Sequence, residues 1–480
     1  MALPNVARRS PWGLAMAATI AAAAVLRLIG LGSGLWYDEI WTLVESVRRP
    51  LFEIVTHFPD VNVHPLYSVL AHASLEVFGD SAWALRLPAW AFGVASVWMV
   101  YALGARLISP AAAWAAAAVL AVSYQHIWFS QNARGYTLMG FFTLASTYFL
   151  LRAAESNRGG HYGLYALTSA AGAYTQLTMA FVTVGHAAVI VIGKIFGWSK
   201  TRSQKLAPLA LAWAAAAILT AVLYIPYASG VIAHFDKPAP KQIAEFATGG
   251  WAIAETLRNF LSGSGMIATV VTLLVSGLGA LSLLRLRPLA FALLFTPVLI
   301  TAAALAAFGQ PIRPRFFFFV AGAAAICAGR GIELIAERLT REPQHTTRYL
   351  VAGTALLVAL AAAGLPRNYR VPKQDFDAAV RYLEDQAAGG AVIAAAGPGC
   401  YPVEQYYGKA DWACLRSVGD LQSMRAVRSQ VFVMYTLTDY IERDLRNELR
   451  ATCPESRRFP GTLGGGDVVI CDLRRTTGVP

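Results

Sequence analysis

Two adjacent carboxylates stand directly after the first hydrophobic run of the chain. The stretch "GLGSGLWYDEIWTLVES" follows an apolar run over 12–31 and carries Asp38 and Glu39. A helix N-terminus accounts for one acid, because Asp is a favoured cap and a carboxylate in the first turn suits the helix dipole. Ionisable groups beside a membrane-spanning run are rare and usually functional. We therefore expect chemistry here, since a carboxylate can remove the proton of a hydroxyl nucleophile.

Cationic side chains that could bind an anion occur in three later segments. "DVNVHPLYSVL" contains His64, "SQNARGYTL" contains Arg134, and "GQPIRPRFFFF" contains Arg313 and Arg315. Each has an ordinary interpretation alone, because a single histidine often packs or caps and an arginine at a membrane interface often extends toward headgroups. As a set they are more informative, since guanidinium groups bind phosphate through forked hydrogen bonds. The set predicts a site for a phosphate-bearing lipid and a hydroxyl acceptor.

The elements that must position these residues are membrane helices. The chain has 480 residues, of which 56% are hydrophobic and 14% charged, whereas soluble domains carry about 25% charge. Runs of about 20 apolar residues can span a bilayer. Eleven such runs lie near 12–31, 82–107, 110–128, 136–152, 162–179, 181–198, 206–225, 263–284, 288–308, 316–334 and 348–365. The sequence predicts a polytopic α-helical membrane protein with about 11 spans.

The basic residues predict the orientation of the spans. The net charge of +12 arises mainly from Lys and Arg in alternate loops, beginning with Arg8 and Arg9. Cytoplasmic loops concentrate these residues, so we expect a cytoplasmic N-terminus, a retained first span and an extracytoplasmic C-terminus. A nucleic-acid partner is not expected, because no basic face interleaved with aromatic residues occurs on a soluble segment. The acids and cations above then map to the outer side of the membrane.

The outer loop over 32–81 is longer than a connection requires. Its apolar residues at helical spacing are Ile40, Leu43, Val44 and Val47. This spacing predicts an amphipathic helix along the membrane surface. Pro65 is favoured in a first helical turn, and we expect a second helix from Pro65 to Phe78. We assign the loop, with the spans, to a catalytic domain over 1–366.

The tail over 367–480 has a different pattern. "DFDAAVRYLEDQ" and "YIERDLRNELR" predict helices, whereas "AVIAAA", "VFVMYT" and "DVVICDL" predict buried strands. Alternating strands and helices indicate a small α/β domain, which the topology places outside the membrane.

Four of the five cysteines lie in this tail, and Cys327 lies inside a span. Disulfides persist outside the cytoplasm. Four cysteines allow three pairings, of which we predict Cys400–Cys414 and Cys453–Cys471. Four unpaired core thiols are the alternative.

Several motifs resemble one known family. "LWYDEIWT", "HPLYSVL", "ALRLPAWAFGV" and "SQNARGYTL", in this order, resemble the C-type (GT-C) membrane glycosyltransferases, in particular the branch of protein O-mannosyltransferases and aminoarabinose transferases. The resemblance covers about 30–140, with a weaker match over 310–335. It implies a polyprenyl-phosphate sugar donor, a hydroxyl acceptor in the cell envelope, inversion at the anomeric carbon, and a hexosyl- or pentosyltransferase activity.

The resemblance also implies residue roles. Asp38 would be the general base for the acceptor hydroxyl, and Glu39 would orient the acceptor or hold the local hydrogen-bond network. Arg134, with Arg313 or Arg315, would neutralise the departing polyprenyl phosphate. The remaining substrate-binding candidates within the motifs are His64, Tyr67 and Tyr136.

The sequence departs from the aminoarabinose transferases at one place. Val63 stands where those enzymes have a metal-binding glutamate, and His64 where they have a lysine that faces phosphate. We therefore assign no metal ligands and leave a divalent cation open as a cofactor. Protein O-mannosyltransferases carry His-Pro here, so lipid, glycan and protein acceptors all stay open.

Two other functions fit the same location, which we expect to be a bacterial inner membrane. A flippase for a lipid-linked sugar would carry ionisable groups along a path through the bilayer, and the spans have few. Arg27 is the main exception, and we expect it to reach the interface because it lies near the outer end of its span. A ligase of lipid-linked oligosaccharides shares the donor chemistry but would ordinarily lack the acidic pair after its first span.

Overall fold

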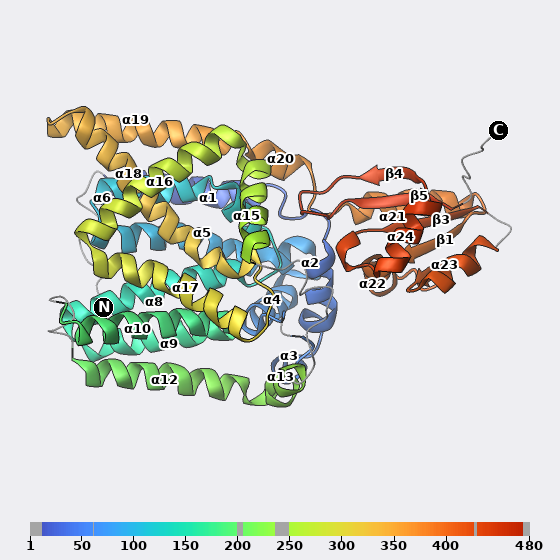
Figure 1. Cartoon of the computed structure of the whole chain (residues 1–480), viewed down its shortest axis with the longest axis horizontal. Coiled ribbons are helices and arrows are strands. Elements are labelled where there is room, and N and C mark those ends of the chain that lie inside the picture. Colours follow the sequence, from blue (N-terminus) through green and yellow to red (C-terminus); the bar gives the residue numbers. More distant parts are fainter. Residues whose placement is uncertain (1–11, 61, 199–204, 236–248, 427–429, 474–480) are drawn as a thin grey trace. The chain divides into compact units, whose positions relative to one another are not determined.

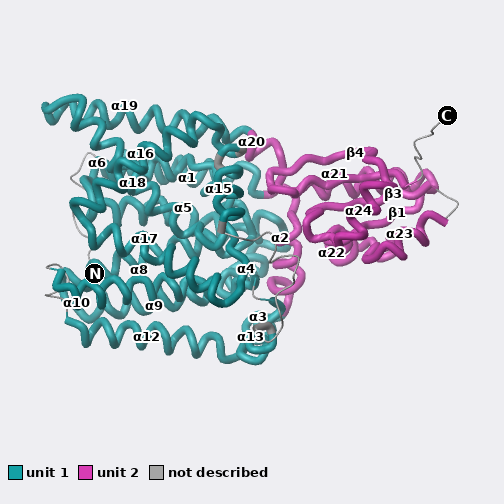
Figure 2. The backbone as a smooth tube through the Cα atoms, viewed as in Figure 1, with its two compact units in different colours: residues 1–31, 50–366 teal, residues 32–49, 367–480 magenta. Residues whose placement is uncertain are grey.

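The computed structural model describes residues 12–60, 62–198, 205–235, 249–426 and 430–473. The chain divides into two compact units (Figure 2). The first unit contains Met1–Leu31 and Pro50–Pro366, and the second contains Gly32–Arg49 and Arg367–Pro480. The predicted cytoplasmic residues Arg8 and Arg9 lie outside the described residues.

The first unit consists of long apolar helices that run side by side (Figure 1). Within the described part of the chain, eight helical segments are long and apolar enough to cross a membrane. Four are single helices: α5 (Ala82–Leu107), α8 (Tyr136–Ser156), α16 (Met266–Leu286) and α17 (Pro288–Ala307). The others are Leu177–Ile195, which contains α10 (Ala180–Ile195); Leu206–Ala233, with α12 (Leu206–Tyr224); Pro314–Leu339, with η4 (Pro314–Val320) and α18 (Ala321–Leu339); and Pro343–Arg370, with α19 (Pro343–Ala362) and α20 (Leu365–Arg370).

Three of the eleven predicted spans are shorter helices than expected. They are α1 (Trp12–Leu28), α6 (Pro110–Ala121) and α9 (Gly159–Thr175). The predicted run over 110–128 is interrupted, because the side chain of Ser123 accepts a hydrogen bond from His126 N and begins a separate helix, α7 (Tyr124–Ser130). A hydroxyl at this position accepts from one of the backbone N–H groups of the first turn, which have no partner within the helix. The polytopic helical architecture is confirmed.

The side chain of Arg27 forms hydrogen bonds to both sides of the break between α6 and α7. Its side chain is 0% exposed, and its guanidinium donates to the carbonyl oxygens of Leu120 and Ala121 at 3.2 and 2.9 Å. These carbonyls lie at the end of α6, where the last carbonyls lack partners within the helix, and Leu120 O also accepts from Ser123 N at 3.2 Å. The same guanidinium contacts His126 Nδ1 at 2.9 Å and Ser130 Oγ at 3.1 Å. Arg27 therefore joins α1 to the α6–α7 break. The sequence had suggested that it reaches the interface, and the structure shows that it does not.

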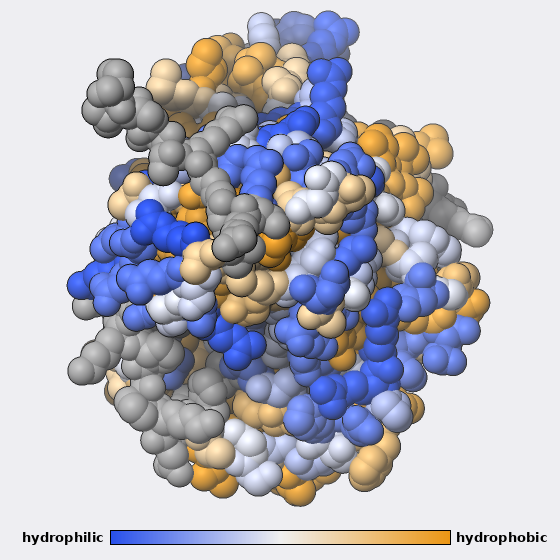
Figure 3. All heavy atoms as spheres, turned by 90° about the vertical axis from the view of Figure 1, so that its right-hand side faces the viewer, coloured by the Kyte–Doolittle hydropathy of each residue, from blue (hydrophilic) through white to orange (hydrophobic). Residues whose placement is uncertain are grey.

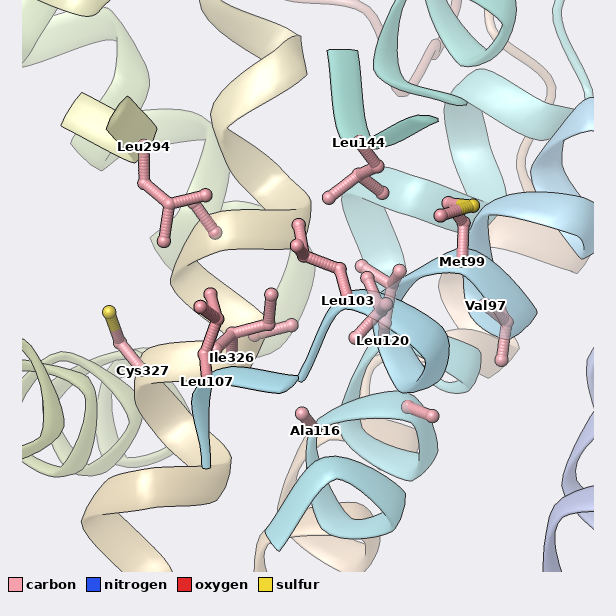
Figure 4. Close-up of a cluster of buried hydrophobic side chains, with 14 of the residues drawn as sticks. Val97, Met99, Leu103, Leu107, Ala116, Leu120, Leu144, Leu294, Ile326 and Cys327 are labelled. Atoms are coloured by element: carbon pink, nitrogen blue, oxygen red, sulfur yellow. The ribbon is translucent and has the colours of Figure 1, made fainter. Parts of the chain in front are cut away.

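A cluster of buried hydrophobic side chains packs between helices of this unit (Figure 4). Its labelled members come from α5, α6, α8, α17 and α18: Val97, Met99, Leu103, Leu107, Ala116, Leu120, Leu144, Leu294, Ile326 and Cys327. Helices α16 and α18 approach so closely that a Cβ atom on Gly279 would meet the Cys327 carbonyl. Small residues at such crossings are typical of helix packing in membranes.

Shorter helices connect the long ones. The predicted helix from Pro65 to Phe78 is confirmed as α4 (Pro65–Phe78). Three further short helices of the first unit are α3 (Leu51–Thr56), α13 (Ala228–Phe235) and α15 (Gly249–Ser264).

The second unit contains a five-stranded sheet with the order β2-β1-β3-β5-β4. The predicted strands are confirmed as β1 (Val392–Ala396), β3 (Val431–Tyr435) and β5 (Val468–Asp472), and the sequence missed β2 (Ala413–Leu415) and β4 (Glu455–Phe459). Strand β1 pairs in parallel with β2 and β3, whereas β5 pairs antiparallel with β3 and β4.

Four helices accompany the sheet: α21 (Phe376–Ala388), α22 (Cys400–Gln405), α23 (Val418–Arg425) and α24 (Arg443–Thr452). The two predicted tail helices correspond to α21 and α24. In α24, Leu445 and Leu449 are buried one turn apart, whereas Arg443 is exposed. Hydrophilic residues of this kind cover much of the face shown in Figure 3. The predicted small α/β domain is confirmed.

The predicted disulfides are confirmed. Cys400 pairs with Cys414, and Cys453 pairs with Cys471. The first bond joins the start of α22 to β2, and the second joins the end of α24 to β5. Cys327 is a buried free thiol in α18.

The segment 32–49, which the sequence assigned to the membrane domain, groups with the tail. It forms α2 (Tyr37–Thr42) and a continuing π-helix, η1 (Leu43–Val47). The predicted amphipathic helix is therefore present, but Ile40, Leu43 and Val47 are at most 2% exposed. Protein thus covers three of the four predicted apolar residues, and the fourth, Val44, is half-buried. Hydrogen bonds from the tail explain the grouping: Tyr37 N donates to Gln374 Oε1 at 2.9 Å, and the Tyr401 hydroxyl donates to Glu45 at 2.7 Å.

Candidate functional site

His64 lies directly before α4 and is 2% exposed. Its Nδ1 atom is 3.2 Å from the carbonyl oxygen of Thr175, the last residue of α9. A carbonyl oxygen can only accept, so Nδ1 carries the proton in the neutral ring and Nε2 presents a lone pair. Helices α4 and α9 together therefore fix both the orientation and the tautomer of this imidazole.

Burial lowers the pKa of His64 well below its ordinary value of 6.5. The positive charge of Arg134 lowers this pKa further, the hydrogen bond to Thr175 opposes the shift, and the charge of Arg315 adds to it. His64 is consequently neutral at pH 7. The site combines two permanent guanidinium charges with an uncharged imidazole.

Arg134 lies between α7 and α8 and is 0% exposed. Its Nη2 atom donates to the carbonyl oxygen of Asn62 at 2.7 Å. The guanidinium carbon is 6.0 Å from the centre of the Tyr136 ring. Arg134 therefore does not extend toward lipid headgroups, which was the ordinary interpretation of an arginine at this position. A buried cation of this kind is suited to an anionic ligand.

Tyr136 completes the packing around the imidazole. Its ring meets the His64 ring edge to face, with centroids 5.0 Å apart, and it meets Phe129 at 5.1 Å. Gly135 permits this approach, because a Cβ atom there would lie 2.6 Å from Thr175 Cγ2 and 3.1 Å from His64 Nδ1. The crossing of α4, α8 and α9 therefore requires a glycine at this position of the sequence "ARGY".

Several buried polar atoms on these elements have no hydrogen-bond partner among the described residues. Two of them, His64 Nε2 and the hydroxyl of Tyr136, belong to side chains packed edge to face. Buried polar groups in folded proteins are almost always hydrogen-bonded, and an exception points to a ligand or to water. One atom can accept and the other can donate, so together they suit an oxygen-rich ligand.

The other predicted substrate-binding residues differ in their surroundings. Arg315 is half-buried in η4 and acts electrostatically on His64. Arg313, directly before η4, is also half-buried. The Tyr67 hydroxyl, by contrast, donates to the Leu85 carbonyl at 2.6 Å, and the side chain is 0% exposed. Tyr67 therefore joins α4 to α5, and we leave it out of the ligand site.

The acidic pair belongs to the second unit. Asp38 and Glu39 lie in the first turn of α2. Asp38 is half-buried, whereas Glu39 is 0% exposed and accepts a hydrogen bond from Trp36 N at 3.3 Å. Glu39 thus caps the N-terminus of its own helix. Two roles were considered for Glu39, orienting the acceptor and holding the local hydrogen-bond network, and this contact fits the second.

The structure brings His64, Arg134, Tyr136 and Arg315 together in the first unit and carries the acids on α2 of the second. Sequence reasoning missed Thr175, which orients His64, and Gln374, which contacts α2. Thr175 gives no signal in the sequence, because it is one threonine in an apolar run. Within the described ranges no group of three or more His, Cys, Asp or Glu side chains could hold a metal ion. No step below uses a metal ion.

Part of the chain matches a family known from sequence. Residues 62–225 match the model of the family described as dolichyl-phosphate-mannose-protein mannosyltransferase. This range contains His64, Arg134 and Tyr136. No curated protein matches the chain.

Solved structures share the fold along nearly the whole chain. An oligosaccharyltransferase from Archaeoglobus fulgidus, in complex with zinc and sulfate, aligns with a TM-score of 0.58 at 12% identity, covering 94% of this chain and 72% of the other. ArnT from Cupriavidus metallidurans bound to undecaprenyl phosphate aligns with a TM-score of 0.53 at 12% identity, covering 98% and 100%. The same ArnT in the apo state gives 0.50 at 10% identity, with coverage of 97% and 98%.

These likenesses show the fold of the chain. They agree with the resemblance carried by the motifs over 30–140. The chain is a multi-pass membrane protein with the fold of the C-type (GT-C) membrane glycosyltransferases.

Proposed function

We propose that the protein is an inverting glycosyltransferase of the outer face of the membrane. It moves a hexose or pentose from a polyprenyl phosphate to a hydroxyl group of a cell-envelope acceptor. The N-terminus is cytoplasmic, the tail is extracytoplasmic, and the membrane is the bacterial inner membrane. The alternating basic loops support this orientation.

The observation that carries the proposal is the buried cluster of Arg134, His64 and Tyr136. All three lie within the range that matches the mannosyltransferase family. The unpartnered hydroxyl of Tyr136, which can donate, and a buried guanidinium suit a phosphate group. The bound undecaprenyl phosphate in the ArnT structure supports a polyprenyl phosphate as the carrier.

The reaction follows from these groups. The acceptor oxygen attacks the anomeric carbon while Asp38 takes the acceptor's proton. The bond between the anomeric carbon and the phosphate oxygen breaks, and its electron pair stays on that oxygen. Arg134 and Arg315 stabilise the negative charge that develops there, which is usually a large share of catalysis. The Tyr136 hydroxyl donates to a phosphate oxygen, and the products are the glycoside and polyprenyl phosphate.

A product assay tests the proposal. Purified protein is incubated with a panel of polyprenyl-phosphate sugars and cell-envelope lipids, and released polyprenyl phosphate is measured by mass spectrometry. We expect release that depends on one donor and one acceptor together. Movement of intact donor across reconstituted vesicles without any release would instead indicate a flippase and overturn the proposal.

A further inference from the structure

The tail domain contacts the helix that carries Asp38 through one buried glutamine. Gln374 is 1% exposed and lies two residues before α21. Its Oε1 atom accepts from the backbone N–H of Tyr37 at 2.9 Å, and its Nε2 atom donates to Thr436 Oγ1 at 2.9 Å. The amide orientation follows from the chemistry, since a backbone N–H can only donate and must face the oxygen.

Both ends of this bridge are fixed. Tyr37 is the first residue of α2, where backbone N–H groups have no partner within the helix. Thr436 directly follows β3 and is 0% exposed. Backbone hydrogen bonds also hold the chain before Gln374, because the carbonyls of Pro372 and Lys373 accept from Thr462 N and Leu463 N at 2.8 and 3.2 Å.

Further contacts hold the rest of the segment to the tail. The Tyr401 hydroxyl donates to Glu45 at 2.7 Å. The Arg48 guanidinium lies 5.8 Å from the centre of the Tyr406 ring. At the other end, Gly34 passes so close to Asp377 that a Cβ atom would collide with its carboxylate. The segment is therefore attached at its beginning, middle and end, and the Gln374 contact lies next to Asp38.

We propose that Gln374 is a positioning residue for Asp38, and that the tail domain acts in catalysis by holding α2 through it. The inference rests on the proposed function, because it requires Asp38 to be the base. The backbone N–H that Gln374 holds belongs to the residue directly before Asp38, so a shift of this anchor displaces the carboxylate. A displacement of about 1 Å can cost on the order of 100-fold in rate.

Three variants of the full-length protein test the inference. Gln374→Met keeps the side-chain length but removes both hydrogen bonds. Gln374→Glu keeps oxygen acceptors for Tyr37 N and for the Thr436 hydroxyl. Gln430→Met is the matched control, because Gln430 donates to Asp472 in β5 at 2.6 Å, within the same domain.

We expect Gln374→Met to lower kcat by about 10- to 100-fold with the donor KM changed less than about twofold. Gln374→Glu should recover most of this loss, and Gln430→Met should match the wild type. Amide hydrogen exchange in a peptide that contains Tyr37 should be faster in Gln374→Met alone. A wild-type kcat for Gln374→Met, or unchanged exchange at Tyr37 in this variant, would overturn the inference.

The variant Asp38→Asn, measured in the same assay, separates this inference from the proposed function. Full turnover by Asp38→Asn would show that the function itself is wrong. If Asp38→Asn is inactive while Gln374→Met is fully active, the proposed function stands and the positioning role of Gln374 is refuted.

Discussion

The Nδ1 atom of His64 lies 3.2 Å from the carbonyl oxygen of Thr175, which joins the beginning of α4 to the end of α9. This contact holds a neutral imidazole beside Arg134 and Arg315, whose charges help to lower its pKa. His64, Arg134 and Arg315 could each carry a positive charge. Because His64 is neutral, the site holds two positive charges and not three. Burial is the largest cause of the lowered pKa of His64, and the repulsion from the two guanidinium groups adds to it.

The lowered pKa of His64 predicts a pH dependence of stability. The unfolded chain protonates this histidine near its ordinary pKa of 6.5, whereas the folded protein does so only at a lower pH. Between these values the unfolded state binds more protons, so stability falls as the pH drops below 6.5. The slope contributed by one such group approaches about 1.4 kcal/mol per pH unit.

Thermal unfolding of detergent-solubilised protein between pH 7.5 and pH 5 measures this effect. Other histidines contribute in both proteins, so the quantity of interest is the difference between the wild type and His64→Asn. We expect the variant to lose less stability on acidification. Identical pH slopes for the two proteins would contradict the assignment.

Gly135 predicts a steric effect at the same crossing. A Cβ atom there would lie 2.6 Å from Thr175 Cγ2 and 3.1 Å from His64 Nδ1. Gly135→Ala should therefore destabilise the protein by about 1–3 kcal/mol, a typical cost of overpacking, and should weaken donor binding by displacing His64. Melting temperature and donor affinity are the measurements.

The matched control is Gly163→Ala in α9, where a Cβ atom would meet nothing within 4 Å. This change should leave stability equal or raise it by up to about 1 kcal/mol, because alanine favours helix. A second substitution, Thr175→Ser, removes the colliding methyl group and should restore part of the loss in Gly135→Ala. Additive effects of the two substitutions would show that the collision is not the cause.

Arg134 predicts a loss in both binding and rate. Arg134→Lys keeps the charge but removes the forked donors, and Arg134→Gln removes the charge as well. We expect Arg134→Gln to raise the donor KM and to lower kcat by about 100- to 1000-fold, as for loss of one donor to a developing anion. Arg134→Lys should lie between Arg134→Gln and the wild type.

Arg106→Gln serves as the control for Arg134. Arg106 lies in the last turn of α5 and pairs with Glu155 at 2.7 Å. Its loss removes one guanidinium from the predicted cytoplasmic side and should leave donor kinetics unchanged. Equal kinetic effects of Arg106→Gln and Arg134→Gln would show a general response to lost charge.

The accuracy of the sequence-based predictions followed the strength of local patterns. Proline at a first helical turn located α4, and continuous apolar runs located β1, β3 and β5. The missed strands β2 and β4 are the two edges of the sheet. β4 reads "ESRRF" and is largely exposed. Charges on a short edge strand limit unwanted pairing, and they hide β4 from a search for apolar runs, whereas β2 has only three residues.

Long-range contacts decided the features that local patterns did not predict. Arg27 seemed free to reach the interface because its partners, Leu120 and Ala121, are distant in sequence. The segment 32–49 groups with the tail through Gln374, which lies 337 positions after Tyr37. Candidate site residues were recognisable by their chemistry, whereas the residues that orient them, such as Thr175, depend on the folded arrangement.

The proposed reaction depends above all on Asp38 as the general base. Single-turnover transfer by Asp38→Asn, with donor affinity measured on the same preparation, tests it most directly. We predict a fall in the transfer rate of about 100- to 10,000-fold, the range for loss of a general base, with the donor dissociation constant within about twofold of the wild type. Transfer by Asp38→Asn at the wild-type rate would contradict the account.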